Sequence, residues 1–213
     1  MPLFFFISGY LMAFSLQRRG VQEVLMSRCR SILVPFLSWG TLGVITAYVL
    51  NMIDGKQVSV MNFPLEMADQ LIIHPVIWFL FTLFAAGGLL LCSVSLEKKI
   101  GPGAFAVLYV LLLLMPFNEY GCLYYIKWFY PFYLMGYWAN RYAWNLNYPA
   151  AVTVVLLCLF VFLVYLWNRN DYIYINKMNI QPGQFIPESA RLLYRYGVGL
   201  LGILIAWRLG ALL

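Results

Sequence analysis

Two arginines in the segment SRCRSILVPFLSW, Arg28 and Arg30, stand immediately before a long apolar run. The planar guanidinium group presents its N–H donors in a fork that fits phosphate oxygens, so this pair is a candidate site for a phosphate-bearing ligand. Basic residues ahead of an apolar run also anchor membrane helices and fix their orientation. The residues alone leave both interpretations open.

Two further ionisable residues lie at the edge of, or inside, apolar runs. His74, the only histidine of the chain, opens the segment HPVIWFLF, and histidine is the side chain best suited to move protons near neutral pH. The alternative is a hydrogen-bonding group at a membrane surface. Lys127 lies within the aromatic segment CLYYIKWFYPFY, where it is either a buried functional cation or a side chain that snorkels to the interface.

A third group of charges stands near the C-terminus, in IPESARLLYRYG. Glu188, Arg191 and Arg195 recur there at i, i+3 and i+7, which puts the three side chains on one face of a helix. Lipid tolerates such a charged stripe badly, so we expect it to line a cleft or a polar lumen. The four cysteines form no CxxC or other close pair, so neither a disulfide framework nor a metal site is predicted.

The elements that must position these residues are membrane helices. Hydrophobic residues make up 63% of the chain and charged residues 10%, far from the composition of soluble domains. Several stretches approach the roughly 20 apolar residues that cross a bilayer. We predict an all-α, polytopic transmembrane helical bundle of about seven spans. The spans are expected at residues 2–16, 32–53, 76–96, 103–117, 122–139, 149–167 and 191–213.

The charges of the loops predict the orientation of this bundle. Loops on one side hold the whole formal excess of +6, whereas those on the other side are balanced. Because Lys and Arg gather in cytoplasmic loops, we expect the N-terminus outside and the C-terminus in the cytoplasm. Basic residues spread in this way contact anionic lipid rather than nucleic acid. No repeat or linker divides the chain, so residues 1–213 are expected to form a single domain.

Four segments occur in a fixed order along the chain: PLFFFISGYLM, SRCRSILVPFLSW, HPVIWFLFTLF and YPFYLMGYWANR. In this order they resemble acyltransferase family 3, a family of integral membrane acyltransferases that includes O-acetyltransferases of bacterial surface polysaccharides. The resemblance covers most of residues 2–141, and beyond that only the hydropathy agrees. Of the four segments, FFFISGYL and the R-x-R motif are the most specific.

The resemblance implies a multi-pass enzyme of the bacterial inner membrane. Such an enzyme moves an acyl group, commonly acetyl, from cytoplasmic acyl-CoA to a hydroxyl group of a cell-surface or lipid-linked glycan. Acyl-CoA would be a co-substrate, with no bound cofactor and no metal. Ser8 and Gly9 match the family's SG pair, and Arg28 and Arg30 match its basic motif, which favours contact of these arginines with the phosphates of CoA.

A looser match involves His74, Trp78 and Phe79, which correspond to the third motif of the family. The remaining charged candidates match no motif, and we assign them to the binding of the acceptor at the outer face. These residues are Lys127, Glu188, Arg191 and Arg195.

The sequence departs from the family at its start. The family's first helix carries a basic residue and then a histidine, which is the expected catalytic base, and nothing here corresponds to them because the match begins at the second helix. We therefore expect a partial domain that lacks the first helix and the last spans, with the base upstream of Met1 and His74 as the candidate within the chain. Two alternatives stay open: a transporter or flippase-like component for lipid-linked sugars, and a catalytically dead, truncated paralogue.

Overall fold

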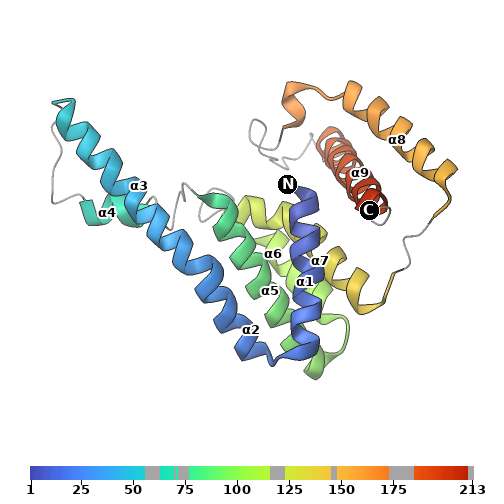
Figure 1. Ribbon diagram of the computed structural model, residues 1–213, viewed down its shortest axis with the longest axis horizontal. Helices are drawn as coiled ribbons and strands as arrows, with labels where there is room; N and C mark the ends of the chain where they lie inside the picture. The colour runs from blue at the N-terminus through green and yellow to red at the C-terminus, as the bar shows by residue number, and fades with distance from the viewer. Residues whose placement is uncertain are drawn as a thin grey trace.

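A computed structural model describes residues 1–55, 63–69, 71, 77–115, 123–144, 148–172 and 185–210. Within these ranges the chain is helical and contains no strand, which confirms the all-α prediction. Figure 1 shows the helices in chain order. They are α1 (Pro2–Arg18), α2 (Val21–Arg28), a π-helical turn (Cys29–Leu33), α3 (Val34–Ile53), α4 (Phe63–Ala68), α5 (Trp78–Ile100), α6 (Ala104–Leu114), α7 (Leu123–Arg141), α8 (Ala150–Tyr165), a 3₁₀ turn (Arg169–Asp171) and α9 (Phe185–Gly210).

Helices α1 and α7 form the centre of the bundle and run parallel to each other. Phe5 stacks on Phe129 near their N-terminal ends, with ring centroids 4.7 Å apart. At the opposite ends, Gln17 donates a hydrogen bond to Asn140 at 3.1 Å. Between these two contacts the backbones approach closely, because each helix places a glycine against the other.

The two glycines at this crossing are Gly9 and Gly136. A Cβ atom on Gly9 would lie 1.9 Å from the carbonyl oxygen of Tyr133, and one on Gly136 would lie 1.9 Å from the carbonyl oxygen of Phe6. Small residues at helix contacts are the usual means by which membrane helices approach closely. Gly9, which belongs to the SG pair of the sequence motif, therefore has a packing role.

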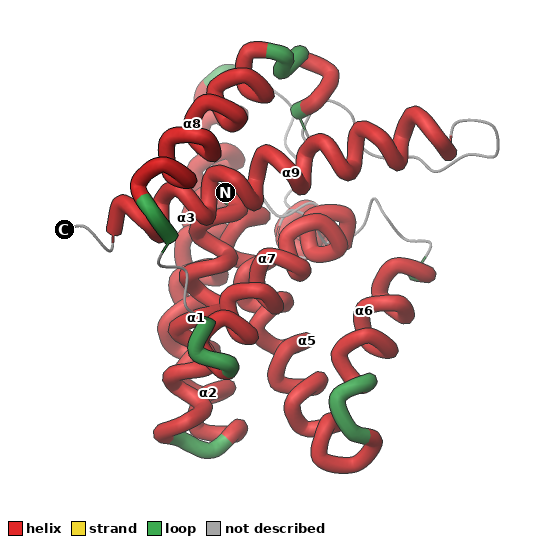
Figure 2. The backbone as a smooth tube through the Cα atoms, turned by 90° about the vertical axis from the view of Figure 1, so that its right-hand side faces the viewer, coloured by secondary structure: helices red, strands yellow, loops and turns green. Residues whose placement is uncertain are grey.

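Helices α5 and α6 cover one side of this central pair (Figure 2). A buried hydrogen bond joins the hydroxyl groups of Ser93 on α5 and Tyr130 on α7, at 3.1 Å. The Ser93 hydroxyl also donates to the carbonyl of Leu89. These polar side chains are satisfied within the bundle, as buried hydroxyl groups require.

Proline at position 131 lies inside α7, where it removes a backbone N–H donor and disturbs the carbonyls of the preceding turn. The two carbonyls affected, those of Lys127 and Trp128, accept hydrogen bonds from tyrosines of neighbouring helices. Tyr109 of α6 donates to Lys127 at 3.3 Å, and Tyr196 of α9 donates to Trp128 at 3.2 Å. Two adjacent helices thus satisfy the backbone that the proline disturbs.

Helices α2 and α3 form one continuous helix, Val21–Ile53, through the π-helical turn. Pro35 accounts for this turn. It offers no N–H to the carbonyl of Ser31 and its ring crowds that carbonyl, so the preceding turn widens and the Val34 N–H bonds to the carbonyl of Cys29. In Figure 1, α3 leads away from the bundle, with α4 beside its far end.

Helices α8 and α9 pack on each other, and α9 also packs on α1. Figure 2 shows α9 crossing the bundle at a steep inclination rather than running along it. Two tyrosine hydroxyls hold this pair: Tyr148 donates to the carbonyl of Leu204 at 2.6 Å, and Tyr194 to that of Leu163 at 2.5 Å. Helix α8 is apolar on every side and has no buried residue, which suits contact with lipid.

Each of the seven predicted spans contains a helix, but the helices differ in length. Among the described residues, Val21–Ile53, Trp78–Ile100 and Ser189–Gly210 are long and apolar enough to cross a membrane. Ala104–Leu114 and Ala150–Tyr165 are apolar but shorter. The number of spans and the orientation of the termini stay predictions.

Candidate functional site

The ends of the bundle differ in chemistry. The N-terminal ends of α1, α5 and α7 meet at an aromatic end, which we define by Phe5, Trp78 and Phe129, since both Phe5 and Trp78 stack on Phe129. Their C-terminal ends meet at a basic end, defined by Arg18 and by Arg141 with its partners. Predicted site residues therefore lie toward both ends, and the length of the bundle separates the two groups.

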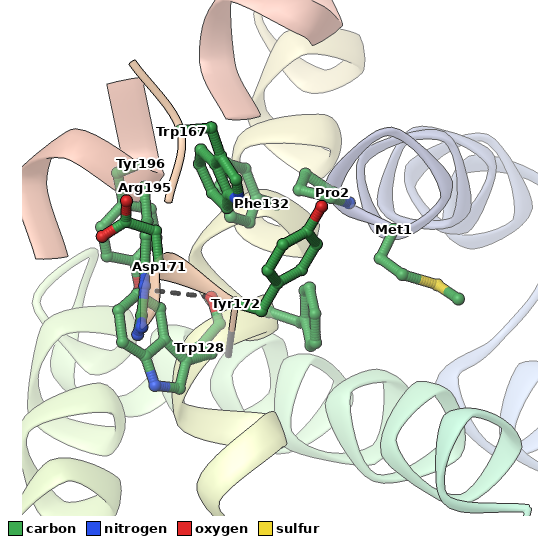
Figure 3. A pocket seen from close by; sticks show the side chains of 10 residues that line it. Met1, Pro2, Trp128, Phe132, Trp167, Asp171, Tyr172, Arg195 and Tyr196 are labelled. Atoms are coloured by element: carbon green, nitrogen blue, oxygen red, sulfur yellow. Dashed lines mark hydrogen bonds between the residues drawn. The ribbon is translucent and has the colours of Figure 1, made fainter. Parts of the chain in front are cut away.

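A cavity of about 320 Å³ opens at the aromatic end between α1, α7 and α9 (Figure 3). Most of its lining is aromatic, with one cation and one carboxylate. The lining residues are Met1, Pro2, Trp128, Phe129, Phe132, Trp167, Asp171, Tyr172, Arg195 and Tyr196. A mainly apolar cavity with a few convergent polar groups is the usual form of a small-molecule site.

Arg195 is the cation of this cavity and is 9% exposed. Its guanidinium carbon lies 5.4 Å from the centroid of the Trp128 ring, within the range of a cation–π contact. Trp128 also stacks on Tyr196, with centroids 5.3 Å apart. The aromatic faces therefore hold the side chain of Arg195 at the cavity wall (Figure 3).

Asp171 supplies the carboxylate, at the end of the 3₁₀ turn that follows α8. Its side chain accepts a hydrogen bond from the backbone N–H of Asn168 at 2.9 Å, which fixes the turn. Arg191 pairs with Asp171 at 3.7 Å. Arg195 therefore lines the cavity, and Arg191 pairs with a residue of its lining. The assignment of both arginines to the acceptor stays a prediction, and the side chain of Glu188 lies outside the described residues.

A second cavity, of about 360 Å³, continues from the first and shares Met1, Pro2, Trp167 and Arg195 with it. Its remaining lining is apolar and comes from α1, α8 and α9: Leu3, Phe160, Val198, Gly199, Gly202 and Ile203.

At the basic end, a wide hollow of about 560 Å³ lies against the start of the helix Val21–Ile53. The residues around it are Arg19, Glu23, Met26, Ser27, Arg30 and Ser31. Arg30 is exposed there. Its guanidinium is therefore accessible to a phosphate-bearing ligand that approaches from this end.

The structure does not place Arg28 beside Arg30. Residues two apart point to different faces of a helix, and Arg28 points into the bundle, where its Nη2 donates to the carbonyl of Ser8 at 3.5 Å. Ser8 itself is 8% exposed. The motif residues Ser8, Gly9 and Arg28 consequently meet inside the bundle, while Arg30 faces outward.

The other predicted residues lie around the aromatic end. Trp78 stacks on Tyr125 at 4.3 Å, and Phe79 contacts Phe4 with centroids 4.9 Å apart, so both belong to the aromatic packing behind the cavity. Lys127 donates to the carbonyl of Met115, the residue that ends α6. This is the contact expected of a cation at a helix C-terminus.

His74, the candidate base, lies outside the described residues. Among the residues that the structure does describe, no group of three His, Cys, Asp or Glu side chains lies close enough to hold a metal ion.

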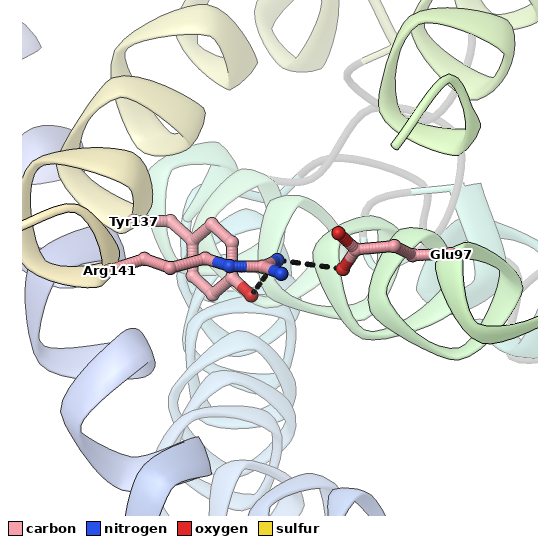
Figure 4. Close-up of polar contacts among 3 residues, drawn as sticks. All are labelled: Glu97, Tyr137 and Arg141. Atoms are coloured by element: carbon pink, nitrogen blue, oxygen red, sulfur yellow. Dashed lines mark hydrogen bonds and ion pairs between the residues drawn. The ribbon is translucent and has the colours of Figure 1, made fainter. Parts of the chain in front are cut away.

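Sequence reasoning missed the ion pair at the basic end. Arg141 of α7 binds Glu97 of α5 at 2.7 Å and donates to the hydroxyl of Tyr137 at 3.1 Å (Figure 4). It also missed Asp171 and Trp128 at the cavity. The one signal for Asp171 was an acidic residue in a polar loop, and an aromatic residue in an aromatic run, such as Trp128, carries no signal of its own.

A helical membrane fold with polar sites at both ends is typical of an integral membrane enzyme. The sequence matches a family described as "Acyltransferase domain" over residues 1–212, and the chain belongs to this family. The match confirms the resemblance that the four motifs predicted.

The chain is also similar in sequence to a curated protein. Nodulation protein NolL of Mesorhizobium japonicum is 26% identical to this chain over 204 residues, which cover 86% of this chain and 49% of NolL. The chain thus spans about half the length of this relative. No solved structure matches the chain.

Proposed function

We propose that this protein transfers an acetyl group from cytoplasmic acyl-CoA to a hydroxyl group of a cell-surface or lipid-linked glycan, in the inner membrane of a bacterium. Membership of the acyltransferase family supports the reaction class. The observation that carries the proposal is the separation of two accessible sites. An arginine faces a wide hollow at one end, and a nearly buried arginine lines an aromatic cavity at the other.

The hollow around Arg30 is the proposed entry site for the donor, at the cytoplasmic face. CoA carries phosphates that suit a guanidinium fork, and Arg30 and Arg19 both line this hollow. Arg28, which starts from the same turn but points inward, would contact the part of the donor that enters the bundle.

The cavity around Arg195 is the proposed acceptor site. Its aromatic walls offer apolar surface to the C–H face of a sugar ring, and Arg195 and Asp171 offer a donor and an acceptor to sugar hydroxyl groups. In the reaction, the sugar oxygen attacks the thioester carbonyl carbon, the carbon–sulfur bond breaks and the proton passes by way of a base to the CoA sulfur. His74 is the candidate for this base within the chain.

The donor site is tested with Arg28→Ala, Arg30→Ala and the matched control Lys99→Ala, which removes an exposed cation beyond the lining of the hollow. Membranes that contain each variant receive radiolabelled acetyl-CoA, and label in the glycan fraction is measured. We expect a KM for acetyl-CoA that is about tenfold higher for the two arginine variants and unchanged for the control. Unchanged affinity in both arginine variants would contradict the donor site.

The acceptor site is tested with Arg195→Gln against Arg169→Gln, since Arg169 is an exposed arginine that does not line the cavity. We expect Arg195→Gln to lower kcat/KM for the acceptor by about tenfold or more, with the KM for acetyl-CoA unchanged. Movement of a lipid-linked sugar across vesicles without consumption of acetyl-CoA would instead identify a transporter.

A further inference from the structure

The hydroxyl group of Tyr133 is a buried polar group that has no hydrogen-bond partner within the described part of the chain. Tyr133 is 0% exposed, and its hydroxyl oxygen makes no hydrogen bond to any residue that the structure describes. Tyr130, one turn earlier on α7, is equally buried, but its hydroxyl group is bonded to Ser93. An unpaired buried hydroxyl lowers stability, so its presence calls for an explanation.

The surroundings of this hydroxyl group are polar on one side and easily moved on the other. Arg28 reaches the Ser8 carbonyl at 3.5 Å, and Gly9, the next residue of α1, packs directly on the backbone of Tyr133, so Arg28 and Tyr133 lie at the same level of the contact between α1 and α7. A hydrogen bond at that distance is weak, so the guanidinium retains donor capacity. Gly87 faces the hydroxyl, since a Cβ atom there would lie only 3.3 Å from it, and the terminal methyl of Met12 lies 4.0 Å from the same Cβ position.

The cover over the hydroxyl group can therefore open without a change in backbone structure. Gly87 contributes no side chain, and Met12 has an unbranched, flexible side chain that repacks readily. Arg28 connects this point to the helix that carries Arg30 and the hollow of the basic end. Tyr133 also lies one turn further along α7 than Phe129, which lines the aromatic cavity. Along the axis of α7, Tyr133 thus lies between the aromatic cavity and the basic end.

We propose that the Tyr133 hydroxyl and the Arg28 guanidinium bind the carbonyl oxygen of the acyl thioester and stabilise the negative charge that develops on it. This inference rests on the proposed acyltransferase function. When the acceptor oxygen bonds to the carbonyl carbon, the π electron pair of the carbonyl group moves onto the carbonyl oxygen. It returns as the carbon–sulfur bond breaks, the CoA thiolate leaves and the proton of the acceptor hydroxyl ends on sulfur. Donors placed in advance in a water-poor site are effective for such a charge.

The structure offers a matched pair of variants for the first test. Tyr133→Phe removes the unpaired hydroxyl, and Tyr130→Phe removes a paired one from the same helix. Both are compared with the unaltered protein, with radiolabelled acetyl-CoA and the membrane glycan fraction as substrates. We expect Tyr133→Phe to lower kcat about 100-fold, with an unchanged KM for acetyl-CoA and no fall in the melting temperature. Tyr130→Phe should keep its kcat and melt at a lower temperature.

A second pair of variants tests the space beside the hydroxyl group. Gly87→Ala would place a methyl group 3.3 Å from the Tyr133 oxygen, whereas Gly88→Ala meets no atom within 4 Å. We expect the first variant to lower the rate of acetyl transfer about tenfold by occupying the position of the carbonyl oxygen. The second variant should transfer acetyl at the normal rate.

The outcomes separate this inference from the function on which it rests. An active unaltered protein together with an equally active Tyr133→Phe variant would overturn the role of Tyr133 alone. The same holds if the activity of Tyr133→Phe falls only in step with its melting temperature, because that result indicates a structural role. An unaltered protein that consumes no acetyl-CoA would overturn the proposed function, and the inference with it.

Discussion

The contact between Gly9 and Gly136 gives the sharpest prediction for stability. Alanine at either position places a methyl group 1.9 Å from a backbone carbonyl oxygen of the other helix, where ordinary van der Waals contact begins at 3.4 Å. The helices must therefore separate by roughly 1.5 Å, because backbone, unlike a side chain, cannot rotate away. This separation would open the contacts of Phe5 and Met12, both of which are 0% exposed.

The expected cost follows from packing energetics. Inserting one methylene into a well-packed core costs about 1–3 kcal/mol, and here the neighbour is main chain. We expect Gly9→Ala and Gly136→Ala each to lower the free energy of unfolding by about 3 kcal/mol. Because the two substitutions act on the same helix crossing, their effects should be less than additive in the double variant.

The measurement is unfolding in mixed micelles of mild detergent and SDS, followed by circular dichroism. Gly43→Ala on α3 is the matched control, since an added Cβ atom there meets nothing within 4 Å. Helix propensity should make this control neutral or slightly more stable. If Gly9→Ala and Gly136→Ala unfold like Gly43→Ala, the close contact of α1 and α7 does not exist and the reasoning is refuted.

Two further predictions concern polar contacts. Tyr109→Phe should cost about 1 kcal/mol of unfolding free energy, because it leaves the Lys127 carbonyl without its donor. In the Pro131→Ala background the cost should shrink, since an N–H at position 131 then satisfies the same carbonyl, and a double-mutant cycle that shows no coupling would contradict this role. For the pair Glu97 and Arg141, of which the arginine is 36% exposed, a cycle with Glu97→Gln and Arg141→Met should give a coupling of about 1 kcal/mol or less that weakens in high salt; a larger, salt-independent value would contradict this estimate.

The sequence predicts the helices well because polar loops separate the apolar runs clearly from one another. It could not predict which helices touch. The contact of α1 with α7 depends on Gly9 meeting Gly136, and no local pattern identifies the partner of a glycine 127 positions away. The continuation of the helix Val21–Arg28 into α3 likewise depends on how Pro35 deforms one turn.

The candidate site shows the same difference between what the sequence predicts and what only the structure reveals. Arg191 and Arg195 are expected at a cleft because a charged stripe avoids lipid. Arg195 lines the cavity and Arg191 pairs with Asp171, and their binding role stays a prediction. Arg28 and Arg30 form one motif in the sequence, yet the structure sends one inward and one outward. Tyr133 gave no signal, because an unpaired hydroxyl is a property of the packed bundle and not of the residue type.

The π-helical turn at Cys29–Leu33 also keeps the buried positions of the long helix Val21–Ile53 on one face. The buried positions Val24, Ile32 and Phe36, and beyond them Gly40, Val44 and Tyr48, are spaced in multiples of four residues. On a regular helix each such step drifts by about 40° around the axis. One extra residue in the turn returns about 100° of that drift. Deleting a single residue from this turn would rotate the rest of α3 about its axis. Gly40 would then turn away from Leu71, and Tyr48 away from Phe63, while every local helical hydrogen bond stays intact.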